Sequence, residues 1–187
     1  MKTYALLLRG INVGGKNKVP MAALKQILAE LGFAEIRTYI ASGNVVLKTD
    51  KMHGEVQNLV EAALPAAFTL DSELVKVLVL SHNQFQRVIA DKPDGFGDQP
   101  DKYHSDAIFL MDVAVADAMA AFNPREGVDM IWPGNGVIYS QRLSAERTKS
   151  RLNTIMASPL YKSMTIRNWN TTVNVMDIMD SVAGGHP

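Results

Sequence analysis

Residues 2–32 of the chain read KTYALLLRGINVGGKNKVPMAALKQILAELG. Thr3–Leu8 is an apolar, β-compatible run, and the glycines after it break that pattern before Pro20. From Met21 onward, apolar residues recur every three or four positions, and Gly32 follows the last of them, as at a helix end. This stretch predicts a strand, a glycine-rich loop and a helix, in that order.

The next fifty residues extend this beginning to a full βαββαβ unit. Two β-rich runs, 36–40 and 45–47, flank the turn-favouring residues Ala41–Asn44. A second helical pattern covers residues 54–67, and another strand pattern covers residues 74–80. This order is the split βαβ pattern of ferredoxin-like folds, in which two helices lie on one face of a four-stranded antiparallel sheet.

The second half of the chain repeats this order of elements. Its predicted strands and helices lie at 107–111, 115–122, 130–132, 137–139, 145–157 and 164–167, and a last helix follows residue 170. We therefore predict an α+β fold with two tandem ferredoxin-like subdomains and a C-terminal helix. Residues 1–90 form the first subdomain with a connecting helix, and residues 106–187 form the second subdomain with the C-terminal helix. Residues 91–105, with two Pro, two Gly and four Asp, form the linker.

Composition and charge exclude several classes of function. The 187 residues contain 19 Lys and Arg against 19 Asp and Glu, whereas proteins that neutralise nucleic-acid phosphates usually carry a basic surplus. Because cysteine is absent, disulfides, thiol nucleophiles and thiolate metal sites are excluded. The four histidines do not stand at metal-ligand spacing, so we predict no metal site.

The lengths of the apolar runs predict a cytoplasmic location. No apolar run approaches the ~20 residues that a membrane-spanning helix needs, so we expect no membrane contact. Arg9 ends the first apolar stretch before a secretory signal of ~7–15 apolar residues is complete. The oligomeric state is left undefined by these features.

The glycine-rich loop is the first candidate binding site. Gly10, Gly15 and Lys16 fit the G-x-x-x-x-G-K spacing of a phosphate loop, but Asn17 replaces the Ser or Thr that contributes a hydroxyl to Mg²⁺. We therefore expect no nucleotide triphosphatase. Glycines still allow backbone N–H groups to surround an anion beside positive side chains. The predicted ligand-binding residues in this loop are Arg9, Gly10, Asn12, Gly14, Gly15, Lys16 and Lys18.

An ordinary loop is the alternative interpretation of this segment. Its glycines would then satisfy turn geometry, and its lysines would be solvated. The sequence pattern favours neither ligand binding nor an ordinary loop over the other.

Ser42, Gly43 and Asn44 are predicted to join the same site. In a split βαβ unit the first and second strands run parallel, so the loop after the first strand and the turn after the second emerge at one edge. A hydroxyl and an amide would then lie beside the basic loop. Taken alone, these three residues are typical of a plain turn.

A polar run around one of the two tryptophans supplies the last candidates. The Arg167 guanidinium suits a carboxylate or phosphate, and we predict that Arg167 and Asn168 bind the ligand. The alternative, which the pattern favours, is structural. Asn168, Asn170 or Thr171 would cap the last helix, and the Trp169 indole would pack as a lid on the core between the two subdomains.

A basic run precedes or enters the predicted helix at 145–157. Its members are Arg142, Arg147, Lys149 and Arg151. The start of a helix favours acidic side chains, so this mismatch indicates a nearby anion, although such a run is more often a solvated surface.

Three motifs together carry a family resemblance. They are Leu6–Asn17 (LLLRGINVGGKN), Thr38–Val45 (TYIASGNV) and Thr165–Thr171 (TIRNWNT). With these, the chain resembles the bacterial family called domain of unknown function 1697 over nearly its whole length. The resemblance implies an α+β fold with two related ferredoxin-like subdomains, and it implies no activity. Ala41 departs from the family, which often has glutamine there.

Small-ligand binding is the function that these features favour. We predict an otherwise uncharacterised protein that binds a phosphate- or carboxylate-bearing ligand at the glycine-rich loop. An RNA-binding module and a partner-binding scaffold are the alternatives, although the apolar strands 5–8 and 45–47 lack the aromatic residues on which RNA-binding sheets stack bases. The spacing of residues assigns no catalytic triad, names no cofactor and leaves open whether the protein is an enzyme.

Overall fold

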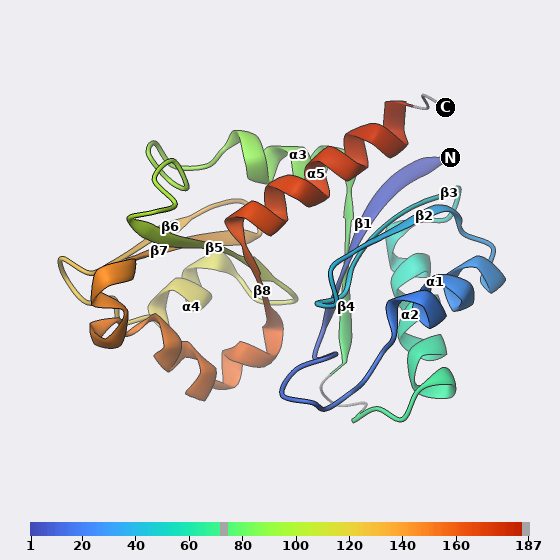
Figure 1. Cartoon of the computed structure of the whole chain (residues 1–187), viewed down its shortest axis with the longest axis horizontal. Helices are drawn as coiled ribbons and strands as arrows, with labels where there is room; N and C mark the ends of the chain where they lie inside the picture. The colour runs from blue at the N-terminus through green and yellow to red at the C-terminus, as the bar shows by residue number, and fades with distance from the viewer. Residues whose placement is uncertain (72–74, 185–187) are drawn as a thin grey trace. The chain divides into compact units, whose positions relative to one another are not determined.

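The computed structural model describes residues 1–71 and 75–184 (Figure 1). It is an α+β protein with two four-stranded antiparallel sheets and a C-terminal helix, α5 (Trp169–Gly184). The chain divides into two compact units, Met1–Gln86 with Asn174–Pro187, and Arg87–Val173. We call these the first and the second unit. No helix in the described ranges is both long and apolar enough to cross a membrane.

The first unit contains the predicted strand, loop and helix. Its sheet has the order β2-β3-β1-β4. The elements are β1 (Lys2–Arg9), α1 (Met21–Glu30), β2 (Ala34–Tyr39), β3 (Asn44–Thr49), α2 (His53–Ala67) and β4 (Lys76–Ser81), followed by the start of α3 (His82–Ala90). Leu74, part of the predicted strand 74–80, lies outside the described residues. Because β3 is antiparallel to both β1 and β2, β1 and β2 run parallel, which confirms the predicted direction of these strands.

Strand β1 lies between β3 and β4 and is buried along almost its whole length. Every residue from Thr3 to Leu8 is buried. Leu6 and Leu8 join the core that α1 and α2 cover, and both helices lie on this face of the sheet (Figure 1). Ala5 and Leu7, which alternate with them, are fully buried on the other face. This double burial explains why the strand is an uninterrupted apolar run rather than an alternating one.

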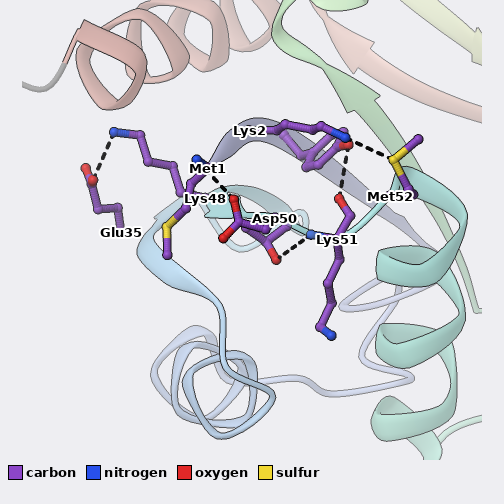
Figure 2. A network of polar contacts seen from close by, with 9 residues as sticks. Met1, Lys2, Glu35, Lys48, Asp50, Lys51 and Met52 are labelled. Atoms are coloured by element: carbon purple, nitrogen blue, oxygen red, sulfur yellow. Dashed lines mark hydrogen bonds and ion pairs between the residues drawn. The ribbon is translucent and has the colours of Figure 1, made fainter.

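Strand β2 is an edge strand with a bulge. Ala34 pairs with Lys48 and Arg37 pairs with Val46, so β2 has one extra residue between these pairs. Glu35 lies in the bulge with a left-handed φ of 48°. Figure 2 shows that its carboxylate points to Lys48 on β3, and Oε1 lies 2.9 Å from Nζ. The Glu35 side chain therefore binds the neighbouring strand β3.

The second unit has the same strand order, but one helix and 3₁₀ turns cover its sheet in place of two helices. Its sheet is β6-β7-β5-β8. The elements are β5 (Tyr103–Leu110), α4 (Val115–Ala120), β6 (Asp129–Pro133), β7 (Val137–Leu143), the 3₁₀ turns η1 (Ser144–Lys149), η2 (Leu152–Ala157) and η3 (Pro159–Ser163), and β8 (Met164–Asn168). Ile108 and Ile138 of the sheet pack with Ala118 of α4 and with Leu152 and Ile155 of η2. Strand β5 begins at Tyr103, within the stretch predicted as a linker, and α4 ends two residues before the predicted 122.

The helix predicted at 145–157 is wrong, because two 3₁₀ turns, η1 and η2, occupy this region, and η3 follows it. Ser150 has an extended backbone and separates the first turn from the second. Contacts with residues distant in the sequence hold the backbone groups at this break. The Arg151 N–H donates to the Asp129 carboxylate at 2.8 Å, and the Arg125 guanidinium donates to the Lys149 carbonyl at 3.2 Å. Side-chain bonds of this kind compete with the regular helical pattern.

Asp129 is the anion that lies among the basic residues noted in the sequence. It is 6% exposed, its Oδ2 also accepts from the Arg125 N–H at 2.9 Å, and it faces Arg142 in the β6–β7 register. Burial alone would raise the carboxyl pKa. Hydrogen bonds from Ser150 and from the two backbone N–H groups, with the charge of Arg142, outweigh burial and lower the pKa of Asp129.

An aromatic cluster covers the other face of the second sheet. Phe96 makes edge-to-face contacts with Trp132, Tyr139 and Trp169 at centroid distances of 6.0, 5.2 and 5.0 Å. The Tyr139 hydroxyl donates to the Val88 carbonyl at 2.8 Å. Burial, followed by the charge of Asp91, raises the pKa of Tyr139 to about 12. Trp169 therefore packs against aromatic residues of this unit, and its predicted place as a lid between the subdomains stays a prediction.

Gly97 offers a test of this cluster. A Cβ at Gly97 would overlap the Trp169 indole, whereas a Cβ at Gly127 would meet nothing within 4 Å, and φ is nearly equal at the two positions, +76° and +75°. Both Ala variants carry left-handed strain of about 1–2 kcal/mol, and we expect Gly97→Ala to lower the free energy of unfolding by about 1–3 kcal/mol more. Urea denaturation followed by tryptophan fluorescence measures the difference. Equal losses in the two variants would contradict the close packing of the indole.

Asp129 offers a second test. Asp129→Asn should lower the free energy of unfolding by about 1–3 kcal/mol at neutral pH, because backbone donors lose a charged acceptor. Since the folded-state pKa is lowered, this stabilisation is complete above the unfolded pKa of about 3.9 and is lost as pH falls below it. Urea denaturation at a series of pH values should therefore show the gap between variant and wild type closing below about pH 4. Asp117→Asn, at an exposed position on α4, is the control. A gap that stays constant down to pH 3 would contradict the role of the charge.

Candidate functional site

The glycine-rich loop forms a small hairpin. The Asn12 N–H donates to the Asn17 carbonyl at 2.9 Å, and the Lys16 N–H donates to the Val13 carbonyl at 3.0 Å. Gly14 and Gly15 occupy the two central positions with φ of 58° and 77°. Positive φ at both positions is the pattern of a type I′ turn, which strongly favours glycine. The two glycines are therefore explained by turn geometry.

This hairpin differs from a phosphate loop. In a phosphate loop the helix begins at the lysine, but α1 begins only at Met21. The amide groups of Asn12 and Lys16 are occupied by the hairpin bonds. The space next to the turn is open, since a Cβ at Gly14 or Gly15 would meet no atom within 4 Å.

Asn12 joins the loop to the turn between β2 and β3. Its Nδ2 donates to the Ala41 carbonyl at 2.8 Å and to the Val19 carbonyl at 2.9 Å, and its Oδ1 accepts from the Val19 N–H at 2.8 Å. Asn12 has a φ of 54°, a left-handed conformation that asparagine tolerates better than most residues. We call this set of bonds the Asn12 clamp.

The β2–β3 turn lies directly against the end of β1. The Leu8 N–H donates to the Gly43 carbonyl at 2.8 Å. A Cβ at Gly43 would lie 2.8 Å from both Leu8 Cβ and Ile11 Cδ1, so the contact leaves no room for a side chain. Asn44 is buried, and its Nδ2 donates to the Tyr39 carbonyl and to Ser42 Oγ, both at 3.0 Å.

Ten of the twelve predicted site residues lie on two segments that the Leu8–Gly43 and Asn12–Ala41 hydrogen bonds join. We call residues 9–18 and 42–44 the loop–turn rim. Lys16, Lys18 and Ser42 are exposed, and Arg9 is half-buried. Asn44 and Gly43 are buried and hold the turn in place. That these residues bind an anion stays a prediction.

Arg167 and Asn168 belong to the second unit, whereas the loop–turn rim belongs to the first. Arg167 is 7% exposed and donates from Nη1 to Thr165 Oγ1 and to the Ile166 carbonyl, both at 2.9 Å. Burial lowers its pKa to about 10. Asn168 Oδ1 accepts from the Asn170 N–H at 3.0 Å, which confirms the predicted cap of the last helix.

A groove in the first unit was not predicted from the sequence. It has a volume of about 360 Å³ and lies between β2 and residues 174–182 of α5. Its lining residues are Arg37, Thr38, Tyr39, Asn174, Asp177, Ile178, Ser181 and Val182. The sequence holds one signal for it, because polar residues recur at positions 174, 177 and 181 on one helix face. Nothing in the sequence pairs that face with β2.

No metal site accompanies either arrangement in residues 1–71 and 75–184. In these ranges no group of three or more His, Asp or Glu side chains is placed to hold an ion.

Comparison with protein-family models matches residues 1–139 to the family described as "Protein of unknown function (DUF1697)". The chain belongs to this family. The match includes the loop–turn rim, so the first two motifs of the sequence resemblance lie inside it. A search of curated proteins gave no significant match to this DUF1697 protein.

Two solved structures were compared with the DUF1697 chain. A conserved bacterial protein from Streptococcus pneumoniae is 24% identical, with a TM-score of 0.76 over 95% of this chain and 98% of that chain. This likeness shows a shared fold. An unknown protein from Galdieria sulphuraria is 10% identical over 98% and 94% of the two chains, and its TM-score of 0.26 is too low to compare folds.

The Asn12 clamp of the DUF1697 protein can be tested by Asn12→Asp. The variant keeps the size of the side chain but removes both Nδ2 donors, so two carbonyl groups lose their partner. We expect the free energy of unfolding to fall by about 1–3 kcal/mol. Urea denaturation followed by circular dichroism measures it, with the exposed Asn58→Asp on α2 as the matched control. If the two variants were equally stable, the clamp would not hold the loop.

Proposed function

We propose that this protein binds a small phosphate- or carboxylate-bearing ligand at the loop–turn rim. The observation that carries the proposal is the Asn12 clamp. It fixes the glycine hairpin against the β2–β3 turn, while Lys16, Lys18 and Ser42 stay exposed at the surface. A basic surface held in one conformation loses less entropy on binding than a mobile loop would.

The residues of the rim have complementary roles in this proposal. Lys16 and Lys18 supply positive charge, which at about 4 Å from an anion is worth about 1–4 kcal/mol at the effective dielectric constants of water and protein surfaces. The open space beside Gly14 and Gly15 lets an anion approach the backbone closely. Arg9, at the end of β1, is the third basic residue of the rim.

We also propose that both units are ferredoxin-like. The strand orders β2-β3-β1-β4 and β6-β7-β5-β8 are equivalent, and both sheets are antiparallel. The first unit contains the complete βαββαβ order, whereas 3₁₀ turns replace the second helix of the second unit. The shared strand order supports two tandem copies of one ferredoxin-like unit.

RNA binding on the first sheet is less favoured by the structure. Recognition sheets of the RNA-binding class stack bases on exposed aromatic residues of their central strands. The central strand β1 is buried on both faces, and its one aromatic residue, Tyr4, is 4% exposed. A base has no access to that strand in this unit.

Thermal denaturation with a panel of phosphorylated metabolites and di- and tricarboxylates tests the proposed function. A ligand present at a hundred times its Kd should add about 2.7 kcal/mol to the free energy of unfolding. The double variant Lys16→Gln with Lys18→Gln should lose most of the shift, while Lys25→Gln on α1, which is also exposed, should keep it. If no compound shifts the transition, or if both variants respond like wild type, the rim is not the binding site.

A further inference from the structure

The groove between β2 and α5 has the dimensions of a small-molecule site. Its volume of about 360 Å³ lies near the lower end of the range of ~300–1,000 Å³ that ligand pockets occupy. All eight lining residues belong to the first unit, and none belongs to the loop–turn rim. We call it the β2–α5 groove.

Two opposite charges line the β2–α5 groove without neutralising each other. Arg37 comes from β2 and Asp177 from α5, and both are exposed. Among the described residues, neither side chain takes part in an ion pair or a side-chain hydrogen bond. Glu35, the acidic residue nearest to Arg37 in the sequence, is committed to Lys48, as Figure 2 shows. The cation and the carboxylate are therefore both available to a ligand.

Apolar and hydrogen-bonding groups line the groove together with these charges. Ile178 and Val182 are one turn apart on α5, and Val182 is 3% exposed, so they give the groove an apolar wall. Ser181 lies one turn after Asp177 on the same helix, and Tyr39 lies two residues after Arg37 on β2. A mostly apolar wall with a few polar groups is the usual composition of a ligand pocket.

The edge of β2 limits the size of the occupant. As the outermost strand of its sheet, β2 has backbone N–H and C=O groups that do not pair with β3. The bulge between Ala34 and Arg37 interrupts this edge, so only Arg37–Tyr39 is regular beside the groove. Bulges of this kind prevent long strands from pairing with an edge, and a short extended molecule fits the three regular residues better than a protein strand.

We propose that the β2–α5 groove binds a small peptide-like zwitterion of di- or tripeptide size. Its carboxylate pairs with the Arg37 guanidinium, which can bind both oxygens at once. Its ammonium group pairs with Asp177, its peptide group lies along the edge of β2, and an apolar side chain contacts Ile178 and Val182. This site uses none of the residues of the anion site proposed above, so the two proposals stand separately.

NMR titration with the dipeptide alanyl-leucine tests the site. Backbone amide signals of Arg37–Tyr39 and of residues 174–182 should shift and saturate with a Kd of about 1 mM or below. The doubly blocked N-acetyl-alanyl-leucine amide, which lacks both charges, should bind at least tenfold more weakly. If alanyl-leucine gives no saturable shift up to about 10 mM, or shifts signals elsewhere, the proposal is wrong.

Charge-matched variants and ligands assign each contact. Arg37→Gln should weaken alanyl-leucine about tenfold but leave the affinity for alanyl-leucine amide unchanged, because that ligand has no carboxylate to lose. Asp177→Asn should weaken alanyl-leucine and spare N-acetyl-alanyl-leucine. Arg87→Gln and Asp117→Asn, at exposed positions outside the groove, are the controls.

Two further outcomes separate this site from the loop–turn rim. The double variant at Lys16 and Lys18 should bind the dipeptide like wild type, whatever its response to phosphate or carboxylate compounds. Equal weakening of all four ligands by Arg37→Gln, with an unchanged circular dichroism spectrum, would mean that Arg37 acts without contacting the carboxylate and would overturn the proposed orientation.

Discussion

Burial of β1 on both faces is the constraint on which the first unit depends. A strand that is covered on both sides must satisfy its backbone groups within the sheet, and β1 does so by pairing with β3 on one side and β4 on the other. The same pairing fixes the point at which the chain leaves the sheet. Arg9 and Gly10 emerge beside Gly43, whose carbonyl accepts from Leu8, so the loop and the turn meet for a reason of topology.

The glycine hairpin shows how one motif can serve geometry and binding together. Its type I′ turn accounts for Gly14 and Gly15 without any ligand. Turn geometry does not account for Asn12, which reaches from the loop to the Ala41 carbonyl, 29 residues further along the chain. A plain loop needs no such bond, because its ends are already fixed by β1 and α1. The long-range bond, rather than the glycines, distinguishes this loop from an ordinary connection.

The sequence predicted what local patterns and strand order determine. The strand, loop and helix at the start of the chain, the direction of β1 and β2, and the cap at Asn168 follow from periodicity and capping chemistry, and the structure confirms them. The prediction of a helix at 145–157 was wrong because the Arg151 N–H donates to Asp129, which lies 22 residues earlier in the chain. The β2–α5 groove could not be predicted either, because it also depends on contacts between residues that are distant in the sequence. Arg37 and Asp177 belong to elements that only the folded chain brings together. The periodicity of apolar residues predicts single helices and strands, but it does not predict contacts between distant ones.

The end of β2 connects the loop–turn rim with the β2–α5 groove. Tyr39 lines the groove, and Ile40, the next residue, has a φ of 50°, a left-handed conformation that is rare for a β-branched side chain. Such a conformation carries strain of about 1–3 kcal/mol and persists only where neighbouring contacts impose it. Those contacts are present on both sides, because Asn44 binds the Tyr39 carbonyl and Asn12 binds the Ala41 carbonyl. The bonds that hold the rim therefore also hold the last residue of the groove, and the two surfaces share one support.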